Sequence, residues 1–294
     1  MPIPTEVLQK IRRIQITTAK KASDSFAGEY KSVFKGRGME FVEVREYLPG
    51  DDIRSIDWNV TARMGRPFIK KFVEERELTV MLLLDVSRSS CFGTVNRLKR
   101  DLATEVCAVM GAAATKNNDK VGLIVFTDRI ECFLPARKGT NHVFRVIREA
   151  LYHKAEGHGT DIAGCIQYLN RLITKSAVVF LISDFYEENL KKPLSVASKK
   201  HDIVAVQITD PRDFDMPNVG VVKLDDAETG KSYFLDTSNP TLRREYKRKA
   251  EEKEETQKKL FYSIGMDRVV IDTAEPYEDA LIQFFRKRQM RMMK

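Results

Sequence analysis

The chain's hydrophobic pattern is organised around the segment from Leu78 to Leu84, where six of the seven residues are apolar. An unbroken apolar run of this length, followed by polar residues, is typical of a strand buried on both faces of a sheet. Asp85, Ser87 and Ser89 come directly after it. Open α/β sheets place their binding sites at the carboxyl ends of such strands, so this loop is the first candidate for chemistry.

From Leu78 onward, strand-like and helix-like patterns alternate. Further strands are predicted at Lys120–Thr127, Ala177–Ser183, Asp202–Thr209 and Asp267–Asp272, and helices at Asn96–Lys116, Asn141–His153, Asp161–Thr174, Lys192–Lys200, Pro240–Ser263 and Pro276–Arg288. Ile130–Leu134 is expected to fold back on Lys120–Thr127, and Val219–Leu224 to form a peripheral hairpin with Ser232–Leu235. Strands separated by helices imply right-handed crossovers. We predict an α/β fold with a doubly wound, mainly parallel sheet flanked by helices.

The N-terminal part has a different pattern of apolar and polar residues. Thr5–Ala22 carries apolar residues at helical spacing and is predicted to be an amphipathic helix that packs on its own domain, with a membrane surface as the alternative. Met39–Leu48 and Arg66–Glu75 alternate like strands. We therefore divide the chain into an N-terminal helix with a small β accessory region, residues 1–77, and a sheet domain, residues 78–294.

The single tryptophan lies between the two strand-like pieces of the accessory region. We expect Trp58 to anchor this small sheet, with Arg54 and either Asp57 or Asp51 as ion pairs. A partner surface is the alternative.

Composition indicates an ordinary globular protein, with 43% hydrophobic and 31% charged residues. The net charge is +8, but most basic residues are interleaved with acidic ones, as on a solvated helix face. The four cysteines show no Cys-x-x-Cys spacing, which indicates reduced core residues in place of a disulfide framework or zinc site. Because no apolar run approaches the roughly 18 residues of a membrane helix, we expect no transmembrane segment and a cytoplasmic location.

Three places in the predicted sheet domain offer oxygen ligands. Asp85, Ser87 and Ser89 form an Asp-x-Ser-x-Ser motif, Thr160 precedes a predicted helix, and Asp184 ends the strand Ala177–Ser183. Neighbouring loops at the carboxyl edge of a doubly wound sheet can converge, and Mg²⁺ prefers such oxygens. Taken singly, each residue has a structural interpretation, since Ser and Thr cap helices and acids commonly end strands. The set of five favours a metal-binding site over a catalytic one.

These residues carry a resemblance. Asp85-Val-Ser87-Arg-Ser89, Thr160 and Asp184, in this order, resemble the metal-ion-dependent adhesion site (MIDAS) of von Willebrand factor type A domains. The segment Arg45-Glu-Tyr-Leu-Pro-Gly-Asp-Asp-Ile-Arg-Ser-Ile-Asp-Trp-Asn-Val-Thr-Ala-Arg63 closely resembles the signature of the domain of unknown function 58 family, whose members contain such a fold. Together the two resemblances cover about Lys35 to Asp210.

The resemblance implies a von Willebrand factor A-like domain whose five residues bind Mg²⁺ or Mn²⁺. It also implies association with a MoxR-type AAA+ ATPase, for which the protein would act as an adaptor or co-chaperone. Many relatives have hydrophobic N-terminal spans, and this sequence has none. On this interpretation the protein is not an enzyme, and it binds a partner's carboxylate through the metal ion.

Two alternatives belong to other classes. A Mg²⁺-dependent phosphotransferase or hydrolase using Asp85 would need a second acid two residues later, where Ser87 stands. No Walker-type phosphate loop, Gly-x-Ser-x-Gly motif or dinucleotide-binding fingerprint supports an enzyme. Nucleic-acid binding through the basic C-terminal tail, residues 286–294, lacks the interleaved aromatic residues that such binding commonly uses.

Overall fold

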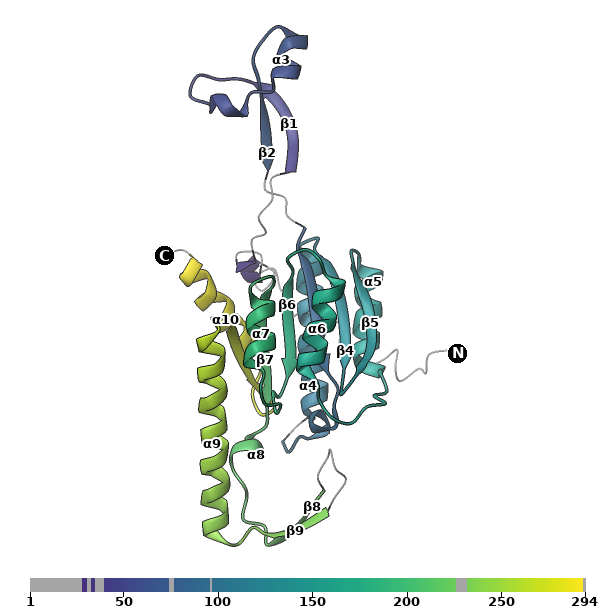
Figure 1. Ribbon diagram of the computed structural model, residues 1–294, viewed down its shortest axis with the longest axis vertical. Helices are drawn as coiled ribbons and strands as arrows, with labels where there is room; N and C mark the ends of the chain where they lie inside the picture. The colour runs from purple at the N-terminus through teal and green to yellow at the C-terminus, as the bar shows by residue number, and fades with distance from the viewer. Residues whose placement is uncertain are drawn as a thin grey trace, which may run out of the picture. The chain divides into compact units, whose positions relative to one another are not determined.

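A computed structural model describes residues 28–30, 33–34, 40–73, 77–95, 97–225 and 232–292 (Figure 1). The described chain forms two compact units, of which the smaller comprises Phe34–Leu78 and the larger contains the described residues from Thr79 onward together with those before Phe34. The helix predicted at Thr5–Ala22 lies outside the described residues. Among the described residues, no helix combines the length and apolar character needed to span a bilayer.

The larger unit is built on a six-stranded sheet. From one edge to the other its strands are β10 (Asp267–Asp272), β7 (Asp202–Thr209), β6 (Val178–Ser183), β3 (Thr79–Asp85), β4 (Lys120–Phe126) and β5 (Ile130–Arg137). All neighbouring pairs are parallel except β4 and β5, which form the expected antiparallel hairpin. The prediction of a doubly wound, mainly parallel sheet flanked by helices is confirmed.

Strand β3 occupies an inner position, and its residues Val80 to Leu84 are all fully buried. Because successive side chains of a strand point to opposite faces, Met81 and Leu83 pack on one side of the sheet and Leu82 on the other. This burial on both faces is the reason why the strand reads as a continuous apolar run and not as an alternating one. The strand ends at Asp85, where the loop at the carboxyl edge of the sheet begins.

Helices cover both faces of the sheet (Figure 1). From Thr79 onward the α-helices of the described residues are α4 (Lys99–Lys116), α5 (Thr140–Tyr152), α6 (Ile162–Leu172), α7 (Lys191–Ser198), α8 (Pro211–Phe214), α9 (Pro240–Ser263) and α10 (Tyr277–Met292). Buried residues of α6 and α7, with Phe261 of α9, form one core cluster with Met81 and Leu83. Helix α4 packs on the opposite face, where Gly111 approaches Leu82.

Most predicted elements agree with the structure within a few residues, and the peripheral hairpin appears as β8 (Val221–Asp225) paired with β9 (Ser232–Asp236). Helix α4 begins at Lys99 instead of Asn96. The chain before it forms a short 3-10 helix, η2 (Arg88–Cys91), and Thr94 is bound through its amide and hydroxyl to the Asp210 carboxylate. The two hydrogen bonds to Asp210 hold Thr94 outside helix α4.

The smaller unit contains an antiparallel pair, β1 (Glu40–Glu46) and β2 (Phe68–Val73). Between the strands lie a short 3-10 helix, η1 (Ile53–Ser55), and the helix α3 (Trp58–Met64), which the sequence pattern did not predict. The Asp57 side chain caps the start of α3 by accepting from two backbone amides, and Gly65 ends it in the left-handed conformation with φ 68°.

Two expectations about this unit are wrong. The side chain of Trp58 is 67% exposed and does not anchor the sheet. Asp51 is paired by Arg45, whose two terminal nitrogens lie 2.8 and 2.9 Å from its carboxylate oxygens, and not by Arg54. The first error arose because Trp58 begins α3, a helix that the sequence pattern did not predict.

Candidate functional site

Asp85 is the last residue of β3 and the centre of the predicted ligand set. Its carboxylate is buried, with 3% of the residue exposed. Oδ1 accepts a hydrogen bond from the Ser87 amide at 2.9 Å, and Oδ2 accepts one from the Ser183 hydroxyl at 2.6 Å. Ser183 ends the neighbouring strand β6, so the parallel pairing of β3 and β6 brings these two groups together.

The two serines of the motif lie on the same side of the loop. Ser87 Oγ and Ser89 Oγ are 3.0 Å apart, and Ser87 is completely buried. Although Ser87 stands at the N-cap position of η2, its side chain makes no capping hydrogen bond. Helix capping therefore does not account for the hydroxyl of Ser87.

Thr160 lies in the loop between α5 and α6, which reaches the serine loop. The Arg88 amide donates to the His158 carbonyl at 3.2 Å, and the Asp161 amide donates to the Thr127 carbonyl at 2.9 Å. Asp161, and not Thr160, caps α6 by accepting from the Gly164 amide at 2.7 Å. Thr160 Oγ1 is buried without a hydrogen-bond partner.

The path of this loop depends on a glycine. A Cβ atom on Gly157 would lie 2.1 Å from Thr127 Oγ1 and 2.1 Å from Asp128 Oδ1. Glu131 Oε1 accepts from the amides of Gly157 and Glu156, at 2.7 and 3.1 Å. The loop that carries Thr160 is thus held by hydrogen bonds from its backbone amides to the Glu131 carboxylate, and a side chain at position 157 would displace Thr127 or Asp128.

Asp184 follows β6 directly and is also buried, with 6% exposed. Oδ1 accepts from the Tyr186 amide at 3.4 Å, whereas Oδ2 is buried and accepts no hydrogen bond. Burial raises the pKa of Asp184, and the charge of Lys99 and the hydroxyl of Ser89 lower it. Ser89, in the motif after β3, thus lies near enough to Asp184 to affect the pKa of this carboxylate.

Negative charge is concentrated here. Burial, and then the charge of Asp184, raise the pKa of Asp85 to about 6, against the hydrogen bonds from Ser183 and Ser87 that lower it. Buried charges are costly unless paired or coordinated to a metal. Hydrogen bonds link three of the five predicted residues, Asp85, Ser87 and Ser89. Asp184 influences the pKa of Asp85 through its charge, and the loop of Thr160 contacts the same segment through Arg88.

The donor set fits a hard divalent cation. It consists of two carboxylates and three hydroxyls, the oxygen ligands that Mg²⁺ and Mn²⁺ take. Two of its oxygens, Thr160 Oγ1 and Asp184 Oδ2, are buried without a hydrogen-bond partner among the described residues. Because buried polar atoms are nearly always satisfied, an ion and its waters would be suitable partners for Thr160 Oγ1 and also for Asp184 Oδ2, which faces the Lys99 ammonium at 3.7 Å.

Sequence reasoning missed Lys99, which is 3% exposed. Its Nζ lies 2.7 Å from Asp213 Oδ2 and 3.7 Å from Asp184 Oδ2, and it also faces the rings of Tyr186 and Phe92, at 5.3 and 5.6 Å. Nothing in the local pattern distinguishes this lysine from the other basic residues near the start of α4. Ser183 was also missed, although a hydroxyl immediately before Asp184 was a visible signal.

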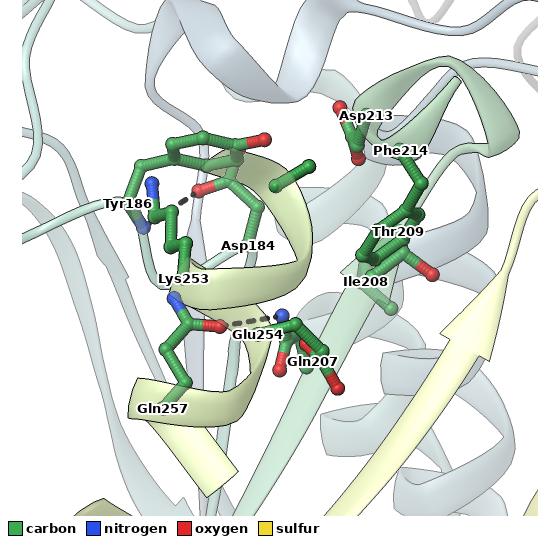
Figure 2. A pocket seen from close by; sticks show the side chains of 11 residues that line it. Asp184, Tyr186, Gln207, Ile208, Thr209, Asp213, Phe214, Lys253, Glu254 and Gln257 are labelled. Atoms are coloured by element: carbon green, nitrogen blue, oxygen red, sulfur yellow. Dashed lines mark hydrogen bonds between the residues drawn. The ribbon is translucent and has the colours of Figure 1, made fainter. Parts of the chain in front are cut away.

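The cavities beside Asp184 are small. One of about 30 Å³ lies between Asp184, Tyr186, Asp213 and Lys253 (Figure 2), and one of about 10 Å³ is lined by Asp85, Lys99 and Asp184. Spaces of this size hold about one or two water molecules, whereas pockets for small organic ligands measure roughly 300–1,000 Å³.

Known proteins resemble this chain over most of its length. The profile of the family described as "Protein of unknown function DUF58" matches residues 43–256. A 245-residue stretch is 32% identical to the "Uncharacterized protein Rv1480" of Mycobacterium tuberculosis, covering 82% of this chain and 76% of the relative.

Solved structures with some similarity include the conserved hypothetical protein BatB from Bacteroides thetaiotaomicron, at 18% identity and a TM-score of 0.45, covering 72% of this chain and 99% of that one. The VWA domain of SpRpn10 is 12% identical with a TM-score of 0.36, covering 72% of this chain and 95% of that one.

Proposed function

Since the chain belongs to the DUF58 family of proteins of unknown function, we propose that it is a metal-ion-dependent protein-interaction module that binds a partner's carboxylate through Mg²⁺ or Mn²⁺. One observation carries the proposal. Two of the five oxygen groups predicted from sequence, Thr160 Oγ1 and Asp184 Oδ2, are buried without a hydrogen-bond partner among the described residues, although Asp184 Oδ2 has the Lys99 ammonium 3.7 Å away. An ion held by the set would satisfy both.

The chemistry follows from the donor set. Ser87, Ser89 and Thr160 offer neutral oxygens, while Asp85 and Asp184 supply charge directly or through water. Both Asp85 oxygens already accept hydrogen bonds, which favours an indirect role for this residue. An ion with few directly bound carboxylates keeps its attraction for an external one, so an Asp or Glu of a partner can complete the coordination.

The family resemblance implies a MoxR-type AAA+ ATPase as the partner, with this protein acting as its adaptor or co-chaperone. The small cavities beside Asp85 and Asp184 support an interaction site more than a substrate pocket. A protein ligand needs only one carboxylate to reach the ion, and the remainder of its interface can lie on the surrounding surface.

The decisive variant is Thr160→Val, because it removes an oxygen that makes no hydrogen bond with any residue that the structure describes. We expect it to fold normally and to lose Mg²⁺ affinity, measured by isothermal titration calorimetry and by the Mg²⁺-dependent rise in Tm. Saturation at about 100 times Kd adds about 2.7 kcal/mol to the free energy of unfolding, so the effect is easily detected. Thr160→Ser should retain binding.

Ser198→Ala is a matched control. Ser198 Oγ is also buried without a hydrogen-bond partner, but it lines a cavity with His201 and the first residues of β7 and β10, at the amino ends of the strands. This variant should bind Mg²⁺ like the wild type. Equal Mg²⁺ affinity in wild type and Thr160→Val would contradict the metal site.

Partner binding is tested separately with a purified MoxR-type ATPase and this chain, in Mg²⁺ and in excess EDTA. We expect binding in Mg²⁺, and none in EDTA or with Asp85→Ala. Affinity that is unchanged in EDTA would refute metal-dependent capture. Turnover of phosphate esters that Asp85→Asn abolishes would instead favour the phosphotransferase or hydrolase alternative.

A further inference from the structure

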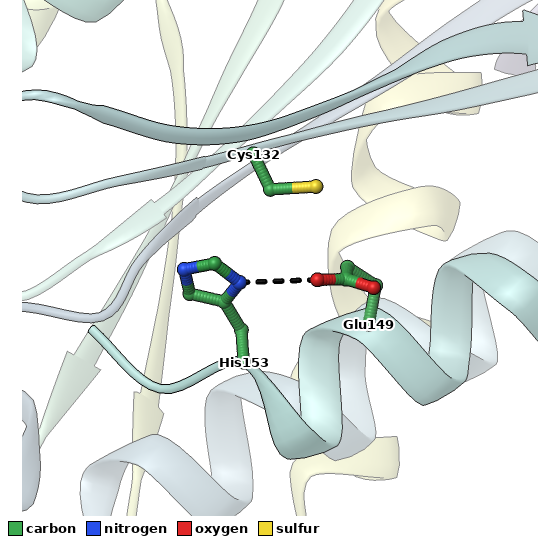
Figure 3. A group of neighbouring side chains, drawn as sticks. All are labelled: Cys132, Glu149 and His153. Carbon is green, nitrogen blue, oxygen red and sulfur yellow. Dashed lines mark hydrogen bonds and ion pairs between the residues drawn. The ribbon is translucent and has the colours of Figure 1, made fainter. Parts of the chain in front are cut away.

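A second group of metal-ligating side chains lies at the edge of the sheet, away from the five oxygen ligands. It consists of Cys132 on β5, Glu149 near the end of α5, and His153 immediately after α5 (Figure 3). One ligand atom from each lies within 4.8 Å of the other two. We propose that these three side chains bind a Zn²⁺ ion.

The spacing is close to that of a tetrahedral site. With metal–ligand distances near 2.0–2.3 Å, ligand atoms in such a site are about 3.4 Å apart. His153 Nδ1 and Glu149 Oε1 are already 3.1 Å apart. The remaining separations need to shrink by at most about 1.4 Å, which side-chain rotation can supply. All three residues are partly exposed, so an ion can enter from solvent.

The other ring nitrogen of His153 provides an independent argument. Its Nε2 lies 3.5 Å from Glu131 Oε2. Metal-binding histidines generally donate the free ring N–H to a carboxylate, which fixes the tautomer and the ring orientation. Glu131 is suited to this role because its side chain is only 3% exposed and is held by the Thr127 hydroxyl and two backbone amides. A rigid carboxylate thus orients the ring towards Glu149 and Cys132.

The ligand types select the metal. A thiolate and an imidazole favour Zn²⁺ over Mg²⁺, which prefers oxygen donors only. On binding, the Cys132 thiol releases its proton to solvent, His153 coordinates through the Nδ1 lone pair, and Glu149 coordinates as a carboxylate. Water takes the fourth position. No change of oxidation state is involved.

The zinc ligands come from β5 and from the end of α5, and the chain continues from His153 into the loop that carries Thr160. Glu131 contacts both the end of α5 and this loop, because it faces His153 and binds the amide of Gly157. Zinc at this position would therefore also tether the start of the Thr160 loop. The assignment itself does not depend on the Mg²⁺ site.

Cobalt(II) replaces zinc in such sites and reports a thiolate ligand by a charge-transfer band in the near ultraviolet. The full chain is titrated with Co²⁺ in excess Mg²⁺, so that oxygen-ligand sites are already filled. We expect wild type to develop the thiolate band together with the intense visible bands of tetrahedral Co²⁺, and Zn²⁺ to abolish them by displacement.

Three variants make the test specific. Cys132→Ser should lose the thiolate band, and Cys91→Ser, at an exposed cysteine, should keep it. Glu131→Gln leaves the three ligands in place and should weaken Zn²⁺ binding roughly 10- to 100-fold, measured by competition with a chelating indicator. Circular dichroism and Tm establish that each variant is folded.

Two results would overturn the site. One is the absence of the thiolate band in wild type, in which case His153 serves only as a hydrogen-bonded link between Glu131 and Glu149. The other is a band of unchanged intensity in folded Cys132→Ser. The wild-type titration decides the matter even where a variant does not fold.

Discussion

Lys99 Nζ lies 3.7 Å from Asp184 Oδ2, and the side chains of both residues are less than 5% exposed. The same ammonium group is 2.7 Å from Asp213 Oδ2. A buried cation thus stands beside the carboxylate that we assign to the metal site. The lysine stabilises Asp184 when no divalent ion is bound, and it competes with such an ion for the same negative charge.

Lys99→Met should therefore have two effects. In EDTA it leaves buried carboxylates without their cation and should lower the free energy of unfolding by about 3–5 kcal/mol, measured by urea titration. Mg²⁺ should raise the Tm of this variant by more than it raises that of wild type. Lys249→Met, at an exposed ion pair with Glu245, should change stability by no more than about 0.5 kcal/mol. An equal Mg²⁺ response in wild type and Lys99→Met would argue against competition.

Gly157→Ala should disturb the Thr160 loop, because its Cβ would lie 2.1 Å from Thr127 Oγ1. We expect Mg²⁺ affinity to fall by roughly tenfold or more, as when supporting groups of metal sites are altered. Gly159→Ala is the matched control two residues away, since its Cβ would meet only Asp128 Cβ at 3.7 Å, an ordinary contact. Similar Mg²⁺ affinities for the two variants, measured by calorimetry, would show that the loop path does not control the site.

His201 should make stability depend on pH. It is 2% exposed and neither ring nitrogen has a hydrogen-bond partner. Burial, and then the charge of Lys200, lower the pKa of His201 to about 4, from an ordinary value near 6.5.

The unfolded chain therefore binds a proton on this histidine at a higher pH than the native protein does. Stability from the neutral ring is fully present above about pH 6.5 and is lost as the pH falls towards 4, by up to roughly 3 kcal/mol. Urea titrations of wild type and His201→Asn between pH 7 and 4 measure this difference. A pH dependence that is identical in the two proteins would contradict the assignment to His201.

Trp58 should report directly on the surface of the smaller unit. It is the only tryptophan of the chain and is 67% exposed. We expect its fluorescence emission to be that of a water-exposed indole and to be quenched efficiently by acrylamide. Ile53 and Met64, in the same unit, are 65% and 62% exposed. A blue-shifted, poorly quenched emission would mean that this apolar surface is covered in solution.

Arg45→Ala tests the ion pair between Arg45 and Asp51, which the structure shows where the sequence predicts Arg54 as the partner. The guanidinium binds Asp51 through two hydrogen bonds, and together with the Leu48 amide it lowers the pKa of Asp51. Removing the guanidinium group should alter the turn around Asp51 with little effect on the six-stranded sheet. Proton chemical shifts of residues 48–57 should change, while those of β3 and β6 should not. Unchanged shifts near Asp51 would show that the pair is not formed in solution.

The sequence by itself determined the order of strands and helices, the mainly parallel sheet and the candidate oxygen ligands. These features are local or periodic: a strand buried on both faces must be apolar throughout, as Val80 to Leu84 are, and the carboxyl ends of parallel strands must share one edge. Asp85 and Asp184 could be associated on that basis alone, because each follows such a strand.

Only the tertiary structure decided which charged and aromatic side chains are buried. Lys99 is enclosed because Asp184 and Asp213, distant in the chain, reach it. Trp58 begins α3, a helix that the sequence did not predict, and its side chain is exposed. Glu149 and His153 are four residues apart at the end of α5, but Cys132 is distant from them in the sequence and meets them only in the folded chain. The hydrophobic periodicity of a sequence indicates which face of a helix or strand is buried, but not which distant segment of the chain packs on that face.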